Sequence, residues 1–242
     1  MPASENAPIF ENDTENPDLS HEDEFTAGVP SVLIDATEKL PPSSPLVALT
    51  FDDGPSEHTS RILDILQQYS GRVTFFVQGN LIEQNKTKIN RALYMGCEVI
   101  SHAWDHPDLT ELPKKEIKKQ LVQTAAALKS VTGMSLPMFR PPYGYVNDLV
   151  KQVAKKLGLA MIIWTLDPRD WEVRDADIVY DLVMKDVKDG DIVLCHDVYE
   201  STAEAMSRII PELIQKGYRL VTVSDLLRRK YGKLIPGELY HN

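Results

Sequence analysis

The sequence lacks several features that would assign a function class directly. No apolar run among its 242 residues approaches the roughly 18 residues that a membrane-spanning helix needs. No Gly-x-Gly-x-x-Gly follows a candidate strand, which excludes the usual dinucleotide-binding motif. Only two cysteines occur, Cys97 and Cys195, and both lie in apolar runs, so we expect buried thiols and no disulfide framework. The first residues show no charged and then apolar leader, and no signal peptide is expected.

Lysine and arginine are missing from the first 38 positions. Eight of the 36 acidic residues lie before position 25, and the first Lys or Arg is Lys39. The net charge of -10 therefore belongs largely to this segment, and the remaining chain is close to neutral. No basic stripe is present, so nucleic acid is not an expected partner. We predict that residues 1–44 form an acidic, disordered linker with a short extended piece near residues 29–40, because few apolar residues offset its ordering entropy.

From Val47 onward, short β-branched runs alternate with segments of helical periodicity. The seven runs lie at residues 47–51, 72–78, 98–104, 138–143, 161–167, 191–197 and 218–223. The helical segments lie at residues 60–69, 81–95, 114–131, 147–157, 176–187 and 202–216. This alternation predicts an α/β fold in which helical crossovers join parallel strands. Seven repeats favour a barrel or near-barrel, and a doubly wound open sheet is the alternative.

Polar residues gather where these runs end. The residues concerned are Asp52, Asp53, His102, His106, Arg140, Tyr143, Asp170, Trp171 and His196. In parallel α/β folds the carboxyl ends of the strands form the rim on which active sites are built. Each residue alone has a structural explanation, such as a turn at Asp53 or core packing of Trp171. Five such coincidences on one rim favour a catalytic site.

Two imidazoles four residues apart and a carboxylate from another strand predict a metal site. His102, His106 and Asp53 would leave coordination positions open, as a catalytic metal requires. If strand alternation continues, Asp52 points away from Asp53 and is free to act as a base. The same triad suits non-haem Fe(II) oxygenases, but these would not explain the Asp-Asp pair or a distal His-Asp pair.

Five segments resemble, in order, the motifs of the polysaccharide deacetylases, the NodB-homology domain of carbohydrate esterase family 4. They are residues 50–55, 102–106, 140–144, 170–171 and 194–196. The resemblance covers residues 45 to 228 and implies a single domain built as a distorted, incomplete (β/α)7-type barrel. It also implies one divalent ion, with zinc preferred over cobalt, manganese or nickel. We place the catalytic domain at residues 45–230 and a C-terminal tail at residues 231–242.

The resemblance also assigns roles to residues of this chain. It implies Asp52 as general base with Arg140 as its partner, and His196 as general acid with Asp170 as its partner. The metal ligands would be Asp53, His102 and His106. The backbone N–H of Tyr143 is implied as a donor to the oxyanion. Candidate walls around the acetyl group and the sugar ring are Tyr143, Trp171, Leu194, Trp104 and Tyr145, although core packing explains Trp104 equally well.

One position departs from the family pattern. The family usually carries Ser or Thr after its first motif histidine, whereas this chain carries Ala103. The missing hydroxyl removes one hydrogen bond, worth about 0.5–1.5 kcal/mol. All three predicted metal ligands remain, so we expect altered metal affinity or loop order and an active enzyme.

The expected function is removal of acetyl groups from an acetylated polysaccharide. The likeness of residues 191–224 to bacterial cell-wall members favours N-acetylglucosamine in peptidoglycan, with chitooligosaccharides and acetylated xylan as alternatives. A secreted or envelope-associated monomer is expected. The alternative from another class is an inactive module that binds metal or glycan, although a pure binder needs neither Asp52 nor His196.

Overall fold

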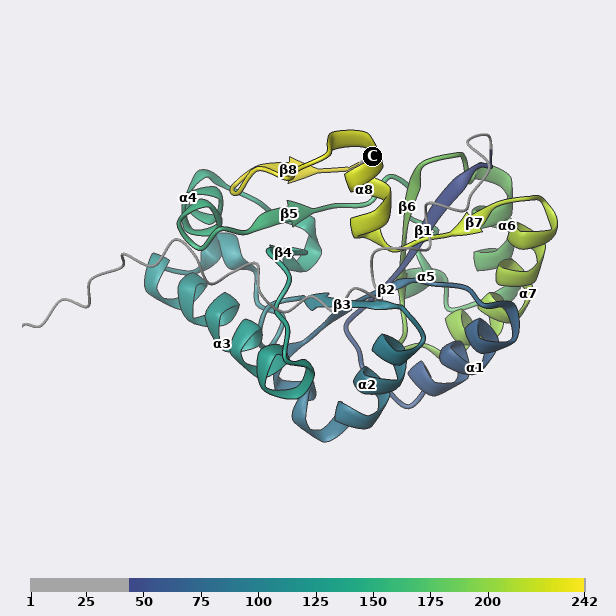
Figure 1. The fold of residues 1–242 in the computed structure, drawn as a ribbon, viewed down its shortest axis with the longest axis horizontal. Coiled ribbons are helices and arrows are strands. Elements are labelled where there is room, and N and C mark those ends of the chain that lie inside the picture. The colour runs from purple at the N-terminus through teal and green to yellow at the C-terminus, as the bar shows by residue number, and fades with distance from the viewer. Residues whose placement is uncertain (1–43, 242) are drawn as a thin grey trace, which may run out of the picture.

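The computed structural model describes residues 44–241, which form one curled sheet of parallel strands covered by helices (Figure 1). The strands are β1 (Leu46–Asp52), β2 (Thr74–Val77), β3 (Glu98–Ser101), β4 (Met138–Phe139), β5 (Ala160–Ile162), β6 (Asp191–His196), β7 (Arg219–Leu220) and β8 (Leu239–Tyr240). The strand order is β6-β1-β2-β3-β4-β5-β8, and β7 pairs with β1. The linker expected over residues 1–44, with its extended piece, lies outside the described residues except for Ser44.

The barrel is completed only in part. After β5 the chain crosses to β6, where Leu166 and Val193 form an isolated parallel bridge. The N–H of Thr165 donates to the carbonyl of Ile192, and the N–H of Leu194 donates to that of Leu166, both at 2.9 Å. Two loop residues thus bridge the gap that a full strand would fill. The predicted α/β fold, a distorted and incomplete barrel, is confirmed.

The end of the chain differs from the expected C-terminal tail. Leu239 and Tyr240 form β8, which pairs in parallel with β5. Tyr240 is buried and packs against the apolar residues inside the barrel. The sheet therefore extends beyond the boundary that we placed at residue 230. A strand of two residues is too short to produce the alternating pattern by which strands are recognised in a sequence.

Eight α-helices surround the sheet in the described part of the chain. They are α1 (Thr59–Tyr69), α2 (Lys86–Tyr94), α3 (Lys114–Thr132), α4 (Asp148–Lys156), α5 (Asp170–Val173), α6 (Ala176–Asp186), α7 (Glu200–Gln215) and α8 (Val223–Tyr231). The six expected helices are present with small shifts, the largest at α2, because residues 79–81 and 83–85 form 3-10 turns. α5 and α8 were not predicted, since α5 has a single turn and α8 begins within an expected strand. None of the helices in residues 44–241 is long and apolar enough to cross a membrane.

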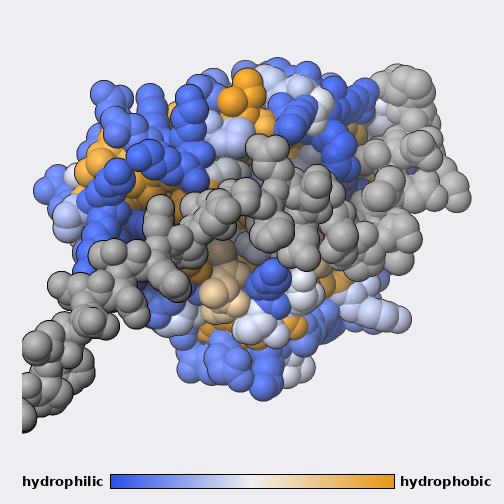
Figure 2. All heavy atoms as spheres, turned by 60° about the vertical axis from the view of Figure 1, so that its left-hand side comes forward, coloured by the Kyte–Doolittle hydropathy of each residue, from blue (hydrophilic) through white to orange (hydrophobic). Residues whose placement is uncertain are grey.

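Alternation along β1 shows how the fold positions the site. Val47, Leu49 and Phe51 face the core shared with the helices, whereas Leu46 and Ala48 belong to the apolar cluster inside the barrel. Thr50 and Asp52 continue the inward-facing series, so β1 carries polar side chains into the upper barrel. The surface visible in Figure 2 is mainly hydrophilic, with small, separate apolar areas. Within residues 44–241 most large apolar side chains lie in three buried clusters.

Candidate active site

Three potential metal ligands meet at the carboxyl ends of β1 and β3. Asp53 follows β1, and His102 and His106 lie in the loop after β3. One ligand atom from each residue lies within 4.8 Å of the other two. Oδ1 of Asp53 is 3.6 Å from Nε2 of His102 and 3.3 Å from Nε2 of His106. Donors at about 2.0–2.2 Å from one ion are separated by roughly 3–4 Å, so this spacing fits a single divalent cation.

Left-handed backbone conformations bring these ligands to one point. The φ angle is 73° at Asp53, 64° at Ala103 and 60° at His106, values that non-glycine residues rarely adopt. The two histidines therefore meet across a loop and do not lie on one helical turn. Such conformations cost free energy, persist only where the surrounding structure imposes them, and cluster at functional sites.

His102 is oriented by a hydrogen bond from within the barrel. Its Nδ1 lies 2.9 Å from the carbonyl oxygen of Arg140. A carbonyl oxygen only accepts, so Nδ1 carries the proton and Nε2 keeps a lone pair for a metal. Burial lowers the pKa of His102 to about 3, so the ring is neutral near pH 7. Two imidazoles and a carboxylate in this arrangement fit zinc or a similar divalent ion.

Asp52 lies beside these ligands, at the last position of β1. Nη1 of Arg140 donates to its Oδ1 at 2.6 Å, and its Oδ2 is 3.6 Å from Nε2 of His102. We expected strand alternation to turn Asp52 away from Asp53, and this was wrong. The positive φ of Asp53 interrupts the alternation, so both carboxylates approach the same imidazole. One oxygen of Asp52 is bound by Arg140, and the other lies next to the candidate metal site.

Asp52 and Arg140 form an ion pair shielded from solvent. Asp52 is 2% exposed and Arg140 is 0% exposed, with its guanidinium 4.0 Å from the ring centre of Phe76. Nη1 of Arg140 also donates to Oγ1 of Thr50 at 2.8 Å. Burial raises the pKa of Asp52 above its ordinary value, although the charge of Arg140 acts in the opposite direction. A carboxylate with a raised pKa is a stronger proton acceptor, which suits a general base.

His196 ends β6 and pairs with Asp170, the first residue of α5. Its Nδ1 is 2.8 Å from Oδ1 of Asp170. Oδ2 of Asp170 accepts hydrogen bonds from the N–H of His196 and the hydroxyl of Thr202, both at 2.7 Å. Burial alone would lower the pKa of His196, but the hydrogen bond and charge of Asp170 raise it to about 9. The ring is then an imidazolium at neutral pH, and a nearby divalent cation would lower that pKa.

An open cleft of about 350 Å³ connects the base, the metal ligands and the acid. Of the predicted wall residues, Tyr143, Tyr145, Trp171 and Leu194 line it. Tyr143 and Tyr145 are each 56% exposed and Trp171 is 43% exposed, so aromatic surface is available to a ligand. Exposed aromatic rings with a polar edge suit the alternating apolar and polar surface of a sugar.

Tyr143, which lines the cleft, also has an unusual backbone conformation. It has a φ of 59° within the short 3-10 turn at residues 142–144. Within residues 44–241 its N–H donates no hydrogen bond, whereas the following N–H groups of Gly144 and Tyr145 are bonded in the turn. A preorganised N–H without a partner can stabilise an oxyanion.

Trp104 does not line the cleft, contrary to the expectation that it forms a wall. Its backbone N–H donates to Oε1 of Gln120 at 2.7 Å, and its ring packs on Gly79 and α3. A Cβ atom at Gly79 would lie 2.5 Å from Cε3 of Trp104, so the close approach requires glycine. The left-handed turn at Ala103 precedes Trp104, whose half-buried ring lies against Gly79 on the side of α3.

Three residues that sequence reasoning did not assign to the site line the cleft. They are Trp164, Asp167 and Tyr199. Asp167 ends the fifth run, where the rim position offered a signal, and Trp164 lies within that run, two residues after β5. Tyr199 lies three residues after His196, and its ring centre is 5.8 Å from that of the imidazole. No pattern in the sequence distinguishes this tyrosine from others, because the loop after β6 places it.

Asp197 joins the loop after β1 to the end of β6. It is fully buried, its Oδ2 accepts from the hydroxyl of Thr59 at 2.5 Å, and its backbone oxygen accepts from the hydroxyl of Ser56. Its Oδ1 has no hydrogen-bond partner within the described residues. A Cβ atom at Gly54 would lie 2.1 Å from this oxygen, so only glycine fits there. Asp197 thus helps to fix the loop that carries Asp53.

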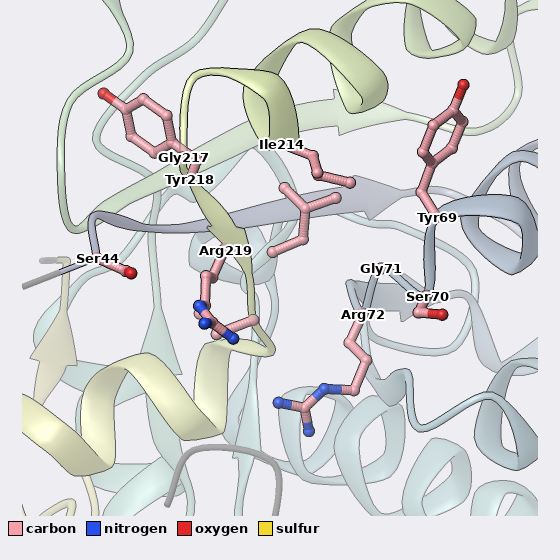
Figure 3. Close-up of a pocket in the computed structure, with 11 residues that line it drawn as sticks. Ser44, Tyr69, Ser70, Gly71, Arg72, Ile214, Gly217, Tyr218 and Arg219 are labelled. Carbon is pink, nitrogen blue, oxygen red and sulfur yellow. The ribbon is translucent and has the colours of Figure 1, made fainter. Parts of the chain in front are cut away.

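Another cavity, of about 530 Å³, lies at the opposite end of the strands (Figure 3). Ser44, Gly71 and Arg72 line it from segments that precede β1 and β2, and Arg219 lines it from the start of β7. Nη2 of Arg72 is bound to Oδ2 of Asp225 at 3.0 Å. Active sites of parallel barrels lie at the carboxyl ends of strands, so this cavity is not the candidate active site.

Known proteins that resemble this chain belong to a family of deacetylases, which agrees with the metal ligands, base and acid found in the cleft. The family model named polysaccharide deacetylase matches residues 39–162, which include all three candidate metal ligands and Arg140. The chain belongs to the polysaccharide deacetylase family. The predicted resemblance is confirmed, and relatives match longer stretches, of 185 and 190 residues.

The chain is similar to bacterial enzymes named for peptidoglycan. It is 40% identical over 190 residues to peptidoglycan-N-acetylmuramic acid deacetylase PdaC of Bacillus subtilis, covering 78% of this chain and 40% of that protein. It is 42% identical over 185 residues to peptidoglycan-N-acetylglucosamine deacetylase PgdA of Listeria monocytogenes, covering 76% and 39%. The solved structure of PdaC superposes with a TM-score of 0.74 at 38% identity, covering 79% of this chain and all of that one. The chain spans about two fifths of the length of the two curated relatives.

Proposed function

We propose that this protein hydrolyses N-acetyl groups of peptidoglycan, with N-acetylglucosamine as the preferred unit. The observation that carries the proposal is one cleft that joins a buried carboxylate, Asp52, to an imidazolium, His196, beside three metal ligands. Relatives named as peptidoglycan deacetylases support the substrate class. A secreted or envelope-associated monomer agrees with that substrate.

The residues have complementary tasks in the proposed reaction. A divalent cation bound to Asp53, His102 and His106, zinc by preference, would polarise the acetyl carbonyl and acidify a water molecule. Asp52 accepts the proton of the attacking water, and Arg140 holds the carboxylate in position. The N–H of Tyr143 donates to the oxyanion that forms on the former carbonyl oxygen.

The second half of the reaction requires an acid. An amine is a poor leaving group unless its nitrogen is protonated, and His196 supplies this proton while Asp170 fixes its ring. The C–N bond then breaks, which releases acetate and leaves a glucosamine unit. The same residues can cleave an acetyl ester, whose alkoxide leaving group departs more easily, so an ester depends less on His196.

The test is acetate release measured with the same metal on peptidoglycan fragments, N-acetylglucosamine oligomers and acetylxylan. We expect the highest kcat/KM on peptidoglycan fragments, loss of activity after chelation, and recovery when zinc is added. Fast acetylxylan turnover with weak dependence on His196 would favour an esterase. Glycan binding without acetate release from any of the substrates would identify a binding module.

A further inference from the structure

The segment directly after β2 lies between the two loops that carry the candidate metal ligands. In the sheet β2 is the neighbour of both β1 and β3. Beyond the last residue of β2, the N–H of Gln78 donates to the carbonyl oxygen of Gly54 at 3.0 Å, on the loop after β1. The N–H of Gly79 donates to the carbonyl oxygen of Ala103 at 2.9 Å, on the loop after β3. This segment therefore ties both ligand loops to one strand.

Gln78 also reaches a candidate metal ligand with its side chain. Its Nε2 donates to Oδ1 of Asp53 at 3.2 Å. The same oxygen lies 3.6 Å from Nε2 of His102 and 3.3 Å from Nε2 of His106. Apart from these two histidines, Gln78 is the only side chain within residues 44–241 that forms a polar contact with this carboxylate. A carboxylate oxygen has two lone pairs, so Oδ1 can accept this N–H and still coordinate a cation.

The carboxylate of Asp53 needs this support more than the other buried ligand does. The φ of Asp53 is 73°, which is locally unfavourable, and its side chain is 21% exposed. His102, in contrast, is buried and is oriented by the carbonyl oxygen of Arg140. The torsion that turns an aspartate carboxylate has broad minima, so an unsupported carboxylate samples many orientations. Gln78 restricts this rotation through the carboxylate itself and restrains the backbone through Gly54.

We propose that Gln78 is a positioning residue, which holds the Asp53 carboxylate in the orientation that binds a divalent cation. The proposal rests on the proposed function, because Asp53 is a metal ligand there. Gln78 belongs to none of the five motif segments and does not line the cleft, so the proposed reaction gives it no role. Its effect should therefore appear in metal affinity and not in contact with the substrate.

The size of the effect follows from the kind of hydrogen bond. Removing a group that is hydrogen-bonded to a metal ligand typically lowers metal affinity or activity roughly 10–100-fold. The amide of Gln78 is neutral and the residue is only half-buried, so we expect a loss of zinc affinity near the lower end, about 10-fold. The three ligands remain in place, and an excess of zinc should therefore restore the filled site.

The experiment measures zinc affinity in the full chain and in three variants. Gln78→Met keeps the length of the side chain and removes the amide. Asn80→Leu is the matched control, because it replaces an amide by an apolar group of similar size two residues away, at an exposed side chain. His106→Ala removes a ligand. Competition with a coloured chelator gives the zinc Kd, and the visible absorption of cobalt-substituted protein reports how the ligands are arranged.

Gln78→Met should raise the zinc Kd about 10-fold and change the cobalt spectrum, whereas Asn80→Leu should match the unmodified protein in both measurements. With zinc in excess, kcat and KM for acetate release should be close to normal in both variants, since neither side chain lines the cleft. Urea unfolding of the metal-free proteins should give similar midpoints, because Gln78 supports the ligand and not the fold.

An unchanged zinc Kd in Gln78→Met would overturn the role of Gln78 and leave the proposed function intact. A raised Kd together with a lowered urea midpoint of the metal-free protein would also overturn it, because the residue would then stabilise the fold in general. If His106→Ala binds zinc as tightly as the unmodified protein, the assigned metal site is wrong and both proposals fail. If zinc binds but no substrate releases acetate, only the proposed function fails, and the Kd values still decide the role of Gln78.

Discussion

The base and acid sides of the cleft are built on similar ion pairs that behave differently. Asp52 with Arg140 and His196 with Asp170 each combine a titratable group with an opposite charge inside the protein. Burial disfavours the charged form in both. At Asp52 burial prevails and the pKa rises, whereas at His196 the partner prevails and the pKa rises to about 9. Asp52 is therefore a stronger base than an ordinary aspartate, and His196 keeps its ring proton to a higher pH than an ordinary histidine.

The hydrogen bonds of the two partners account for the difference. Nη1 of Arg140 donates hydrogen bonds to both Asp52 and Thr50. Its Nη2 has no hydrogen-bond partner within the described residues. Asp170 accepts hydrogen bonds from both the ring and the backbone N–H of His196. The hydroxyl of Thr202 donates a further hydrogen bond to Oδ2 of Asp170. A buried partner whose hydrogen bonds converge on one group controls that group's protonation more strongly than a partner that is shared.

The largest effect should come from removing the titrating groups themselves. Asp52→Asn and His196→Gln should each lower kcat at least about 100-fold, because general acid–base catalysis contributes that much or more. Zinc affinity, measured by calorimetry, should stay close to that of the unmodified protein in both variants. His106→Ala is the comparison, since it should lose zinc and activity together. Turnover near normal in either of the first two variants would remove its residue from the mechanism.

Breaking the base-side pair should reduce stability more than any other change at the cleft. Arg140→Met leaves Asp52 buried without its counter-charge, which we expect to lower the free energy of unfolding by about 3–5 kcal/mol. The acid limb of the pH–rate profile should also move to higher pH. Burial raises the pKa of Asp52, and the charge of Arg140, which lowers it, is absent in this variant. Urea unfolding and initial rates from pH 4 to 8 measure these effects.

The control for this change is the double variant Asp52→Asn/Arg140→Met. With the carboxylate neutralised, much of the stability should return, although the variant is inactive. If the double variant is as unstable as Arg140→Met, the loss came from packing around Phe76 and not from an unpaired charge.

Breaking the acid-side pair should change the pH profile more than the rate at neutral pH. In Asp170→Asn the charge that favours the imidazolium is gone, so the alkaline limb should move to lower pH. The pKa of His196 is raised from 6.5 to about 9 on folding. Its stabilising contribution is therefore fully present below pH 6.5 and lost as the pH rises through about 9. Unfolding at pH 6 and pH 10, on metal-free protein, should show this dependence disappear in Asp170→Asn.

Thr202→Val provides the graded comparison on the acid side. It removes one hydrogen bond to the same carboxylate and keeps the shape of the side chain. The carboxylate then has one competing donor fewer, which favours the imidazolium, so we expect a small shift of the alkaline limb to higher pH, opposite in direction to that in Asp170→Asn. A shift to lower pH would show that Thr202 acts by holding the carboxylate in position against His196.

The smallest effects should arise at Ala103, beside the metal ligand. Ala103 is fully buried at a φ of 64°, where a β-branched residue is strained. Ala103→Thr should lower the free energy of unfolding by about 1–3 kcal/mol without tightening zinc binding. Ala103→Gly, which accepts this φ, should be nearly neutral. Tighter zinc binding in the threonine variant would mean that the loop adopts another conformation and restores the family's hydrogen bond.

Much of the architecture follows from local patterns in the sequence. Runs such as residues 47–51 and 191–197 alternate with amphipathic helices, and parallel strands bring their carboxyl ends to one rim. That rule placed Asp52, Asp53, His102, Arg140 and His196 together without coordinates. The chemical types of these residues then pointed to a metal and a base, whereas the resemblance to the polysaccharide deacetylases implied the acid at His196. Each inference depended on residues close together in the chain or on a general property of parallel sheets.

Other features depend on contacts between distant segments and on single backbone angles. The left-handed conformations at Asp53 and Ala103 bring Asp52 beside the metal ligands and direct Trp104 away from the cleft, against Gly79. The pairing of β8 with β5 and the position of Tyr199 in the catalytic cleft have no periodic signature. A φ of about 60° at a non-glycine residue is locally unfavourable, so no local preference encodes it. Only the packed chain compensates that cost, and the tertiary structure therefore decides where these side chains lie.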